Sequence, residues 1–241
     1  MVEMHSSDIF YTKFANFYAD YAASKAKYLS AVDDFIITEI GLPDNIIDIG
    51  SGDGKRAKQI ADILGIKDLT FLDNSAGMID LANKIRGVKI IQANIADSNF
   101  RADREYKTVL CLWNVFGHIP SAESRKIALN NLVKLTANDG LIFLDVNNRY
   151  NLLQYGVKSA FKNIFKDILL PKDLNGDFKL KFNIAGELIQ TNVHIFNPFE
   201  IQHLIKSAGL KILKRQIINY KSGEKDKNIF EGQLVYKLSK I

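Results

Sequence analysis

Residues 46–49 contain three isoleucines, and three alternating glycines follow them, Gly50, Gly52 and Gly54. Such a β-branched run is typical of a buried parallel strand, and residues 57–64 then carry apolar side chains at helical spacing. Glycine permits a left-handed backbone and lets a ligand lie against the main chain. The free N–H groups at the start of the next helix point at that ligand. Strand, glycine turn and helix therefore predict a site for a nucleotide-like ligand.

Asp48 distinguishes this turn from a dinucleotide site. The dinucleotide pattern is G-x-G-x-x-G, whereas this chain has G-x-G-x-G with an aspartate two residues before it. A carboxylate at this place would repel a diphosphate, and it suits a ligand that carries an ammonium group. The stretch from Asp48 to Gly54 resembles the first motif, D/E-x-G-x-G-x-G, of the class I (Rossmann-like) S-adenosylmethionine-dependent methyltransferases. A glycine-rich surface turn without a ligand is the alternative interpretation.

The resemblance implies S-adenosyl-L-methionine as the cofactor and S-adenosyl-L-homocysteine as the product. Asp48 would then bind the amino group of the methionine moiety. The backbone of the turn would lie under the cofactor at Gly50, Ser51, Gly52 and Gly54. In pattern, the chain is most similar to the small-molecule members of this superfamily.

Asp73 follows the second expected strand, 69–72. An acidic residue at this place in a Rossmann-type sheet accepts the ribose hydroxyls in charge-assisted hydrogen bonds; an acid that only stabilises a helix N-terminus is the alternative. Asn94-Ile95 stands where these enzymes usually have an Asp-Ala pair that reads adenine, and an amide oxygen can still accept that hydrogen bond. The resemblance thus implies further cofactor contacts after the second, third and fourth strands, at Asn74, Met78, Asn94, Ile95, Leu112 and Trp113.

His118 is the first candidate on the acceptor side, because it follows the fourth expected strand, 108–113. An unperturbed imidazole pKa near 6.5 suits proton removal at neutral pH, and a structural histidine is the alternative. Asp145, at the end of the fifth expected strand, could be a base, a substrate anchor or a carboxylate bonded to backbone. Arg149 could meet a substrate carboxylate or phosphate.

Tyr18 is the last catalytic candidate and lies in an aromatic-rich helical segment, 9–40. In related methyltransferases an N-terminal tyrosine often covers the sulfonium, and a cation over an aromatic face gains about 1 kcal/mol or more when it is desolvated. Tyr11 could do the same. The alternative is a pair of amphipathic helices that only packs on the core.

The resemblance implies an α/β fold, a seven-stranded Rossmann-like sheet with helices on both faces and an inserted β-hairpin lid. We expect one methyltransferase domain over residues 1–241, with a helical cap over 1–42 and the lid over 151–196. The lid would hold a helix over 152–170 and a hairpin over 178–196. The remaining elements are expected as a helix over 122–135, a strand over 141–146, a helix over 201–208 and closing strands over 211–220 and 230–238.

Composition is that of a packed globular protein, with 47% hydrophobic residues and a net charge of +5 in 241 residues. The single cysteine, Cys111, excludes an internal disulfide framework and fits a reducing compartment. No apolar run is long enough to span a bilayer, and the polar first residues lack a signal peptide's apolar region. We therefore expect a soluble cytoplasmic monomer or homodimer with no metal site and no membrane partner.

These observations predict an enzyme that transfers a methyl group to a nitrogen or oxygen of a small molecule. An RNA or tRNA methyltransferase and a non-catalytic relative that binds S-adenosylmethionine remain open. An aminopropyl transferase would need an acidic cluster at the fourth strand, and an NAD-dependent oxidoreductase would need G-x-G-x-x-G; the chain has neither. Lys158, Lys162 and Lys166 share a face of one expected helix, as a solvated surface or to recruit an anionic substrate, a membrane or RNA.

Overall fold

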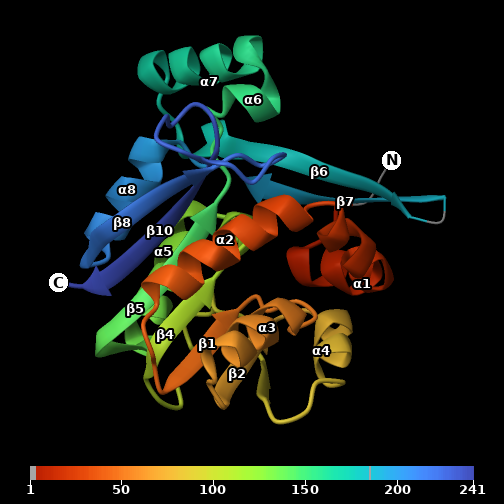
Figure 1. Cartoon of the computed structure of the whole chain (residues 1–241). Coiled ribbons are helices and arrows are strands. Elements are labelled where there is room, and N and C mark those ends of the chain that lie inside the picture. The colour runs from red at the N-terminus through yellow and green to blue at the C-terminus, as the bar shows by residue number, and fades with distance from the viewer. Residues whose placement is uncertain (1–3, 185) are drawn as a thin grey trace.

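The computed structural model describes residues 4–184 and 186–241, and a large mixed sheet runs through its centre (Figure 1). The strand order is β3-β2-β1-β4-β5-β10-β8-β9. Neighbours from β3 to β5 pair in parallel, whereas β10 pairs antiparallel with both β5 and β8. The strands are β1 (Asn45–Ile49), β2 (Asp68–Asp73), β3 (Lys89–Gln92), β4 (Tyr106–Cys111), β5 (Thr136–Val146), β8 (Leu210–Ile218), β9 (Lys225–Asp226) and β10 (Gln233–Lys240). The predicted seven-stranded sheet is confirmed, and β9, with 2 residues, extends it to eight strands.

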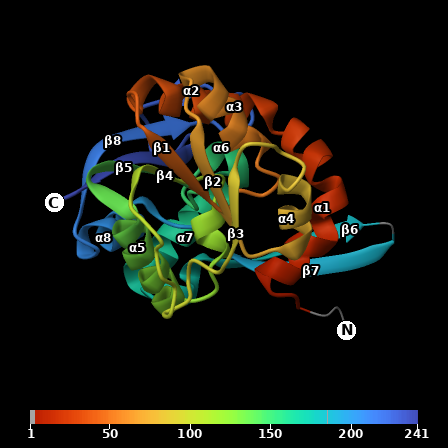
Figure 2. The ribbon, with the colours of Figure 1, turned by 90° about the horizontal axis from the view of Figure 1, so that it is seen from below.

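Helices cover both faces of this sheet, and Figure 2 shows α2 and α3 on one face and α5 and α8 on the other. Asn197 begins α8 with a capping box, in which its side chain accepts from the backbone N–H of Glu200. Ser121 caps α5 by accepting from the N–H of Ser124. The helices of this part are α2 (Ala26–Glu39), α3 (Lys55–Leu64), α4 (Ala76–Ala82), α5 (Ala122–Leu135) and α8 (Pro198–Ser207).

The aromatic N-terminal segment folds as two helices, α1 (Ser7–Ala23) and α2, as predicted. α1 packs against α4, where a Cβ added at Gly77 would lie 2.9 Å from the backbone of Thr12. Phe10 and Phe14 on its other side are buried with Ile189 of β7 (Glu187–His194). α1 therefore lies between the main sheet's edge helix and a β-hairpin.

Residues 151–196 leave the main sheet after β5 and return to it before α8, as predicted for the inserted segment. The segment contains α6 (Leu152–Tyr155), α7 (Val157–Leu169), the 3-10 turn η2 (Asp173–Gly176), β6 (Asp177–Ile184) and β7. β6 and β7 form an antiparallel two-stranded sheet of their own. The single helix expected over 152–170 is wrong, because the chain turns at Gly156, which has φ +81°.

β5 begins at Thr136, directly after α5, and not at residue 141 as predicted. The Thr136 hydroxyl donates to the carbonyl of Leu132 at 2.7 Å and so closes the helix end. The Asn-Asp-Gly signal expected to separate helix from strand lies inside the irregular start of the strand. Among the described residues, no helix has the length and apolar character needed to cross a membrane.

Candidate active site

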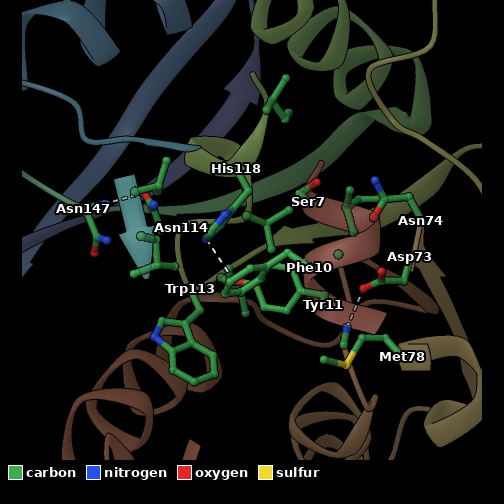
Figure 3. Close-up of a pocket in the computed structure, with 18 of the residues that line it drawn as sticks. Ser7, Phe10, Tyr11, Asp73, Asn74, Met78, Trp113, Asn114, His118 and Asn147 are labelled. Carbon is green, nitrogen blue, oxygen red and sulfur yellow. Dashed lines mark hydrogen bonds between the residues drawn. The ribbon is translucent and has the colours of Figure 1, made fainter. Parts of the chain in front are cut away.

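A cavity of about 320 Å³ opens at the carboxyl ends of the parallel strands, the edge where open α/β sheets bind ligands. α1 and the β6–β7 hairpin wall it from the other side (Figure 3). Its volume falls in the range of small-molecule sites. The predicted residues that line it are Tyr18, Gly50, Gly52, Asp73, Asn74, Met78, Asn94, Ile95, Leu112, Trp113 and His118.

The glycine turn forms the floor of this cavity. The N–H groups of Gly50 and Ser51 donate to the carbonyl of Leu72 at 2.7 and 3.1 Å, which ties the turn to the end of β2. Gly52 has φ +57°, and a Cβ added there would lie 2.8 Å from the Tyr18 hydroxyl. The turn is therefore shaped by backbone conformation and by the close approach of α1.

Ser51 and Gly54 do not line the cavity, although they belong to the predicted motif. Gly54 starts α3 with φ +73°, and a Cβ there would lie 2.4 Å from the ring of Phe71. Its glycine is required for packing between helix and sheet. Their contact with the cofactor stays a prediction.

We expect Gly52→Ala to weaken binding of S-adenosylhomocysteine by about tenfold and to lower the free energy of unfolding by about 1 kcal/mol. The loss of affinity comes from displacing Tyr18, and the loss of stability comes from the positive φ. Gly65→Ala is the matched control, because Gly65 has φ +70° with open space around its Cβ position. It should lose stability alone, as measured by denaturant unfolding and calorimetric titration; equal affinity losses in both variants would contradict the role of the Tyr18 contact.

Asp48 lies at the mouth of the turn and is only 6% exposed. Among the described residues its carboxylate has no hydrogen-bond donor within reach, and burial raises its pKa to about 7. Arg56, which is paired with Asp33 at 2.6 Å, partly offsets that rise. A buried carboxylate without a partner fits the ammonium group of a methionine moiety, although Asp48 is not in the cavity wall itself.

Asp73 stands at the end of β2, with its carboxylate held by the turn. It accepts from the N–H of Gly52 at 2.8 Å and of Ser75 at 2.9 Å. Burial raises its pKa, and these two backbone hydrogen bonds oppose the rise. The carboxylate is thus fixed at the cavity wall with lone pairs free for further donors, as a ribose diol would require.

Asn94 lines the cavity after β3, in the place predicted for adenine recognition. Its side-chain oxygen accepts from the N–H of Ala96 at 2.9 Å, so it already stabilises its own turn. Asn74, Met78 and Ile95 lie along the same side of the cavity. Adenine recognition by this group stays a prediction.

Trp113 and Asn114 form a strained loop after β4, with φ of +55° and +59°. The buried Asp145 holds this loop, because its carboxylate accepts from the Trp113 N–H at 2.9 Å and from the Tyr28 hydroxyl at 2.6 Å. The Asn114 side-chain oxygen accepts from the N–H of Asn147 at 2.9 Å. Asp145 does not line the cavity. It positions the loop and is not placed to contact an acceptor, as the sequence had suggested.

An aromatic wall continues from this loop. The Trp113 ring stacks on Tyr21 with centroids 5.4 Å apart and lies 5.7 Å from Tyr18. Its indole N–H donates to the Tyr220 hydroxyl at 3.3 Å. Phe182 of the hairpin lies 5.3 Å from Tyr21 and completes the wall.

His118 ends the 3-10 turn η1 (Val115–His118) and shares a 3.0 Å hydrogen bond between its Nε2 and the Tyr11 hydroxyl (Figure 3). Burial lowers the pKa of this imidazole to about 4, so the expectation of a value near 6.5 is wrong for this site. Its Nδ1 is buried and has no partner among the described residues. His118 is therefore a neutral hydrogen-bonding group at pH 7.

We expect proton NMR of the folded protein to show one of its four histidines titrating near pH 4. His118→Gln should remove that resonance and leave the other three unchanged, which assigns it. A resonance lost from this variant that titrates near pH 6.5 would contradict the burial of His118.

Arg149 is not brought to the cavity. Its guanidinium pairs with Asp167 at 2.8 Å and Glu200 at 2.6 Å and donates to the carbonyl of Ile195 at 2.8 Å. All of these contacts lie at the junction of β5, the inserted segment and α8. Arg149 stabilises that junction and is not placed to meet a substrate carboxylate or phosphate.

Several residues of the wall were missed from the sequence. Phe182 alternates with other apolar residues in the hairpin, so its strand was visible but its direction toward the cavity was not. Tyr155, Tyr220 and Gln233 come from segments far apart in the chain. No local pattern in the sequence identifies them, because only the tertiary fold brings them together.

Residues 46–140 match the family model of a methyltransferase domain. Three solved methyltransferase structures share the fold of the whole chain. The DhpI–SAM–HEP complex has a TM-score of 0.69 at 15% identity, over 97% of this chain and 95% of that chain. The CcbJ methyltransferase from Streptomyces caelestis has a TM-score of 0.67 at 14% identity, over 90% of each chain. The glycopeptide N-methyltransferase MtfA, complexed with S-adenosyl-L-methionine, has a TM-score of 0.61 at 11% identity, over 88% and 87%.

At such low identities, these likenesses show the fold. No curated protein sequence matches the chain. The family-model match covers β1 to the start of β5, and so includes the glycine turn, Asp73 and His118. This match, within the Rossmann-like fold, identifies the chain as a class I methyltransferase with S-adenosylmethionine as its cofactor.

Proposed function

We propose that this enzyme methylates a nitrogen or oxygen of a small, uncharged acceptor with an apolar or aromatic body. One observation carries the proposal. Among the described residues that line the cavity, Asp73 is the only carboxylate, and none is lysine or arginine. Asp73 is held against the glycine turn at the cofactor end, so the acceptor end offers aromatic rings and neutral polar groups.

S-adenosylmethionine supplies an electrophilic methyl group when it is bound. The chain's own contribution is to align the acceptor and to exclude water from it. Tyr18, Tyr21 and Trp113 would hold the body of the acceptor by stacking. The Tyr11 hydroxyl would meet the reacting group, and His118 would fix the orientation of that hydroxyl.

The low pKa of His118 favours a particular kind of acceptor. A base with a pKa of about 4 removes a proton from an alcohol poorly. An amine in its neutral form is already nucleophilic and needs no such base. One structural relative is a glycopeptide N-methyltransferase, which agrees with nitrogen as the favoured acceptor atom.

We further propose that residues 1–42 and 151–196 act as the cap and lid of one methyltransferase domain. α1 and the hairpin both contribute to the cavity wall, which supports this division. The monomeric or homodimeric state and the cytoplasmic location stay predictions from the sequence.

Two experiments test the proposed activity. Calorimetric titration with S-adenosylhomocysteine tests the cofactor site. Labelled methyl transfer is then compared across neutral amines and alcohols, carboxylates and phosphates, and tRNA. The neutral set should contain the best acceptors, with amines ahead of alcohols. Preferred labelling of tRNA or of anionic metabolites would overturn the proposal, and cofactor binding without transfer to any set would favour the non-catalytic alternative.

A further inference from the structure

α7 presents its apolar face outward. An amphipathic helix on a globular protein normally turns its apolar stripe to the core, but here six large apolar side chains of α7 and its end are between 51% and 70% exposed. Phe161, Phe165 and Ile168 follow the spacing of one helical face. We name this surface the α7 patch, and it consists of Val157, Phe161, Phe165, Ile168, Leu169 and Leu170.

The inner face of α7 is polar and firmly held. Asp167 pairs with Arg149 at 2.8 Å and accepts from the Tyr150 hydroxyl at 2.9 Å and from the side-chain amide of Asn175 at 3.1 Å. The side-chain amide of Asn163 donates to the carbonyl of Arg149 at 3.2 Å. These contacts fix which face of α7 points outward, so the patch is a consequence of the docking and not of a loose helix.

Lysines border the patch on one side. Lys158, Lys162 and Lys166 are exposed and recur at i, i+4 and i+8 next to the apolar stripe. None of the three has an ion-pair partner within the part of the chain that the structure describes. The acid of the helix, Asp167, faces inward. The outer surface of α7 is therefore apolar and cationic.

We propose that α7 docks the protein on an anionic lipid bilayer, lying in the interface with the α7 patch among the acyl chains and the three lysines among the headgroups. Helices of this kind bind membranes through buried apolar area and attraction to anionic lipid. Lysine stems lie along apolar surface while their ammonium groups reach the headgroups. Complementary charge favours this occupant over a second copy of the chain, whose α7 would bring the same lysines together.

The position of α7 is consistent with such docking. It stands beyond the end of the main sheet, with α6 beside it (Figure 1). Gln154 and Tyr155 of α6 line the cavity, and Gly156 joins α6 to α7. A bilayer bound to α7 would thus lie near the lid side of the active site.

Flotation of the full-length protein with vesicles tests the proposal. The protein should bind vesicles of phosphatidylcholine with phosphatidylglycerol and bind those of phosphatidylcholine alone far more weakly. Lys158→Gln, Lys162→Gln and Lys166→Gln together should weaken binding on the order of 100-fold, because each lysine near an anionic surface contributes about fivefold. Phe161→Ser, Phe165→Ser and Ile168→Ser together should weaken it at least about 100-fold.

Matched controls separate the patch from general charge and apolarity. Lys67→Gln, Lys84→Gln and Lys126→Gln change three exposed lysines on other elements. Leu42→Ser, Ile63→Ser and Leu213→Ser change three exposed apolar residues elsewhere. Both control sets should bind vesicles within about twofold of the wild type.

Sedimentation velocity without lipid and calorimetric binding of S-adenosylhomocysteine confirm that each variant is folded. Equal binding to both kinds of vesicle, or equal losses in the patch and control variants, would overturn the proposal. So would a dimer that the Phe161, Phe165 and Ile168 substitutions dissociate, since a second copy would then be the occupant.

Discussion

Asp48→Asn is expected to weaken binding of S-adenosylhomocysteine by about 100-fold, because a buried charge-assisted contact contributes about 2–3 kcal/mol. The same substitution should stabilise the ligand-free protein at pH 8. The Asp48 carboxylate is buried without a hydrogen-bond donor among the described residues, and its pKa is raised to about 7. Asparagine has the same shape and carries no charge.

The pH dependence follows from the direction of this shift. The folded protein binds the Asp48 proton more tightly than the unfolded chain, so ionisation destabilises the fold. That cost grows as pH rises from about 4, the unfolded value, to about 7, and is complete above it. At about 1.4 kcal/mol for each pH unit, the gain from Asp48→Asn is on the order of 4 kcal/mol at pH 8 and close to zero at pH 4.

Denaturant unfolding at several pH values and calorimetric titration measure both effects. Asp53→Asn is the control, because Asp53 belongs to the same turn but does not line the cavity. It should change cofactor affinity by less than about threefold. Unchanged affinity in Asp48→Asn would show that Asp48 does not bind the ammonium group, whatever its effect on stability.

Asp145→Ala should lower the free energy of unfolding by about 3–5 kcal/mol. The substitution leaves the Tyr28 hydroxyl and the Trp113 N–H buried without their acceptor. It also removes the anchor of a loop held at positive φ, so cofactor affinity should fall as Trp113 moves. Denaturant unfolding measures the first effect and calorimetric titration the second.

Tyr28→Phe separates these two effects. It removes one hydrogen bond to Asp145 and leaves the bond to Trp113, so it should cost about 1 kcal/mol and spare cofactor affinity. If Tyr28→Phe impaired cofactor binding as strongly as Asp145→Ala, the anchoring of the Trp113 loop would not explain the loss.

The sheet and the cofactor end of the site could be predicted because both depend on local sequence. Gly50 and Gly52 report a backbone conformation, and Asp73 follows directly from the end of its strand. Parallel strands bring such positions to one edge, so their order along the chain was enough to gather them.

The acceptor end could not be predicted, because distant packing decides it. Tyr11 and His118 are 107 residues apart in the chain, yet they share a hydrogen bond. The pKa of His118 depends on burial by segments that carry no signal for it. Arg149 and Asp145 have the chemistry of substrate-binding residues, but nearby carboxylates and backbone groups occupy them.

Trp113 is the only tryptophan of the chain, and its ring stands in the cavity wall between Tyr18 and Tyr21. Its indole N–H is bonded to Tyr220, and its loop is fixed by Asp145. Selectively excited fluorescence of the whole protein therefore originates at one wall of the active site. Quenching or a spectral change on adding a ligand would report occupancy there without any label.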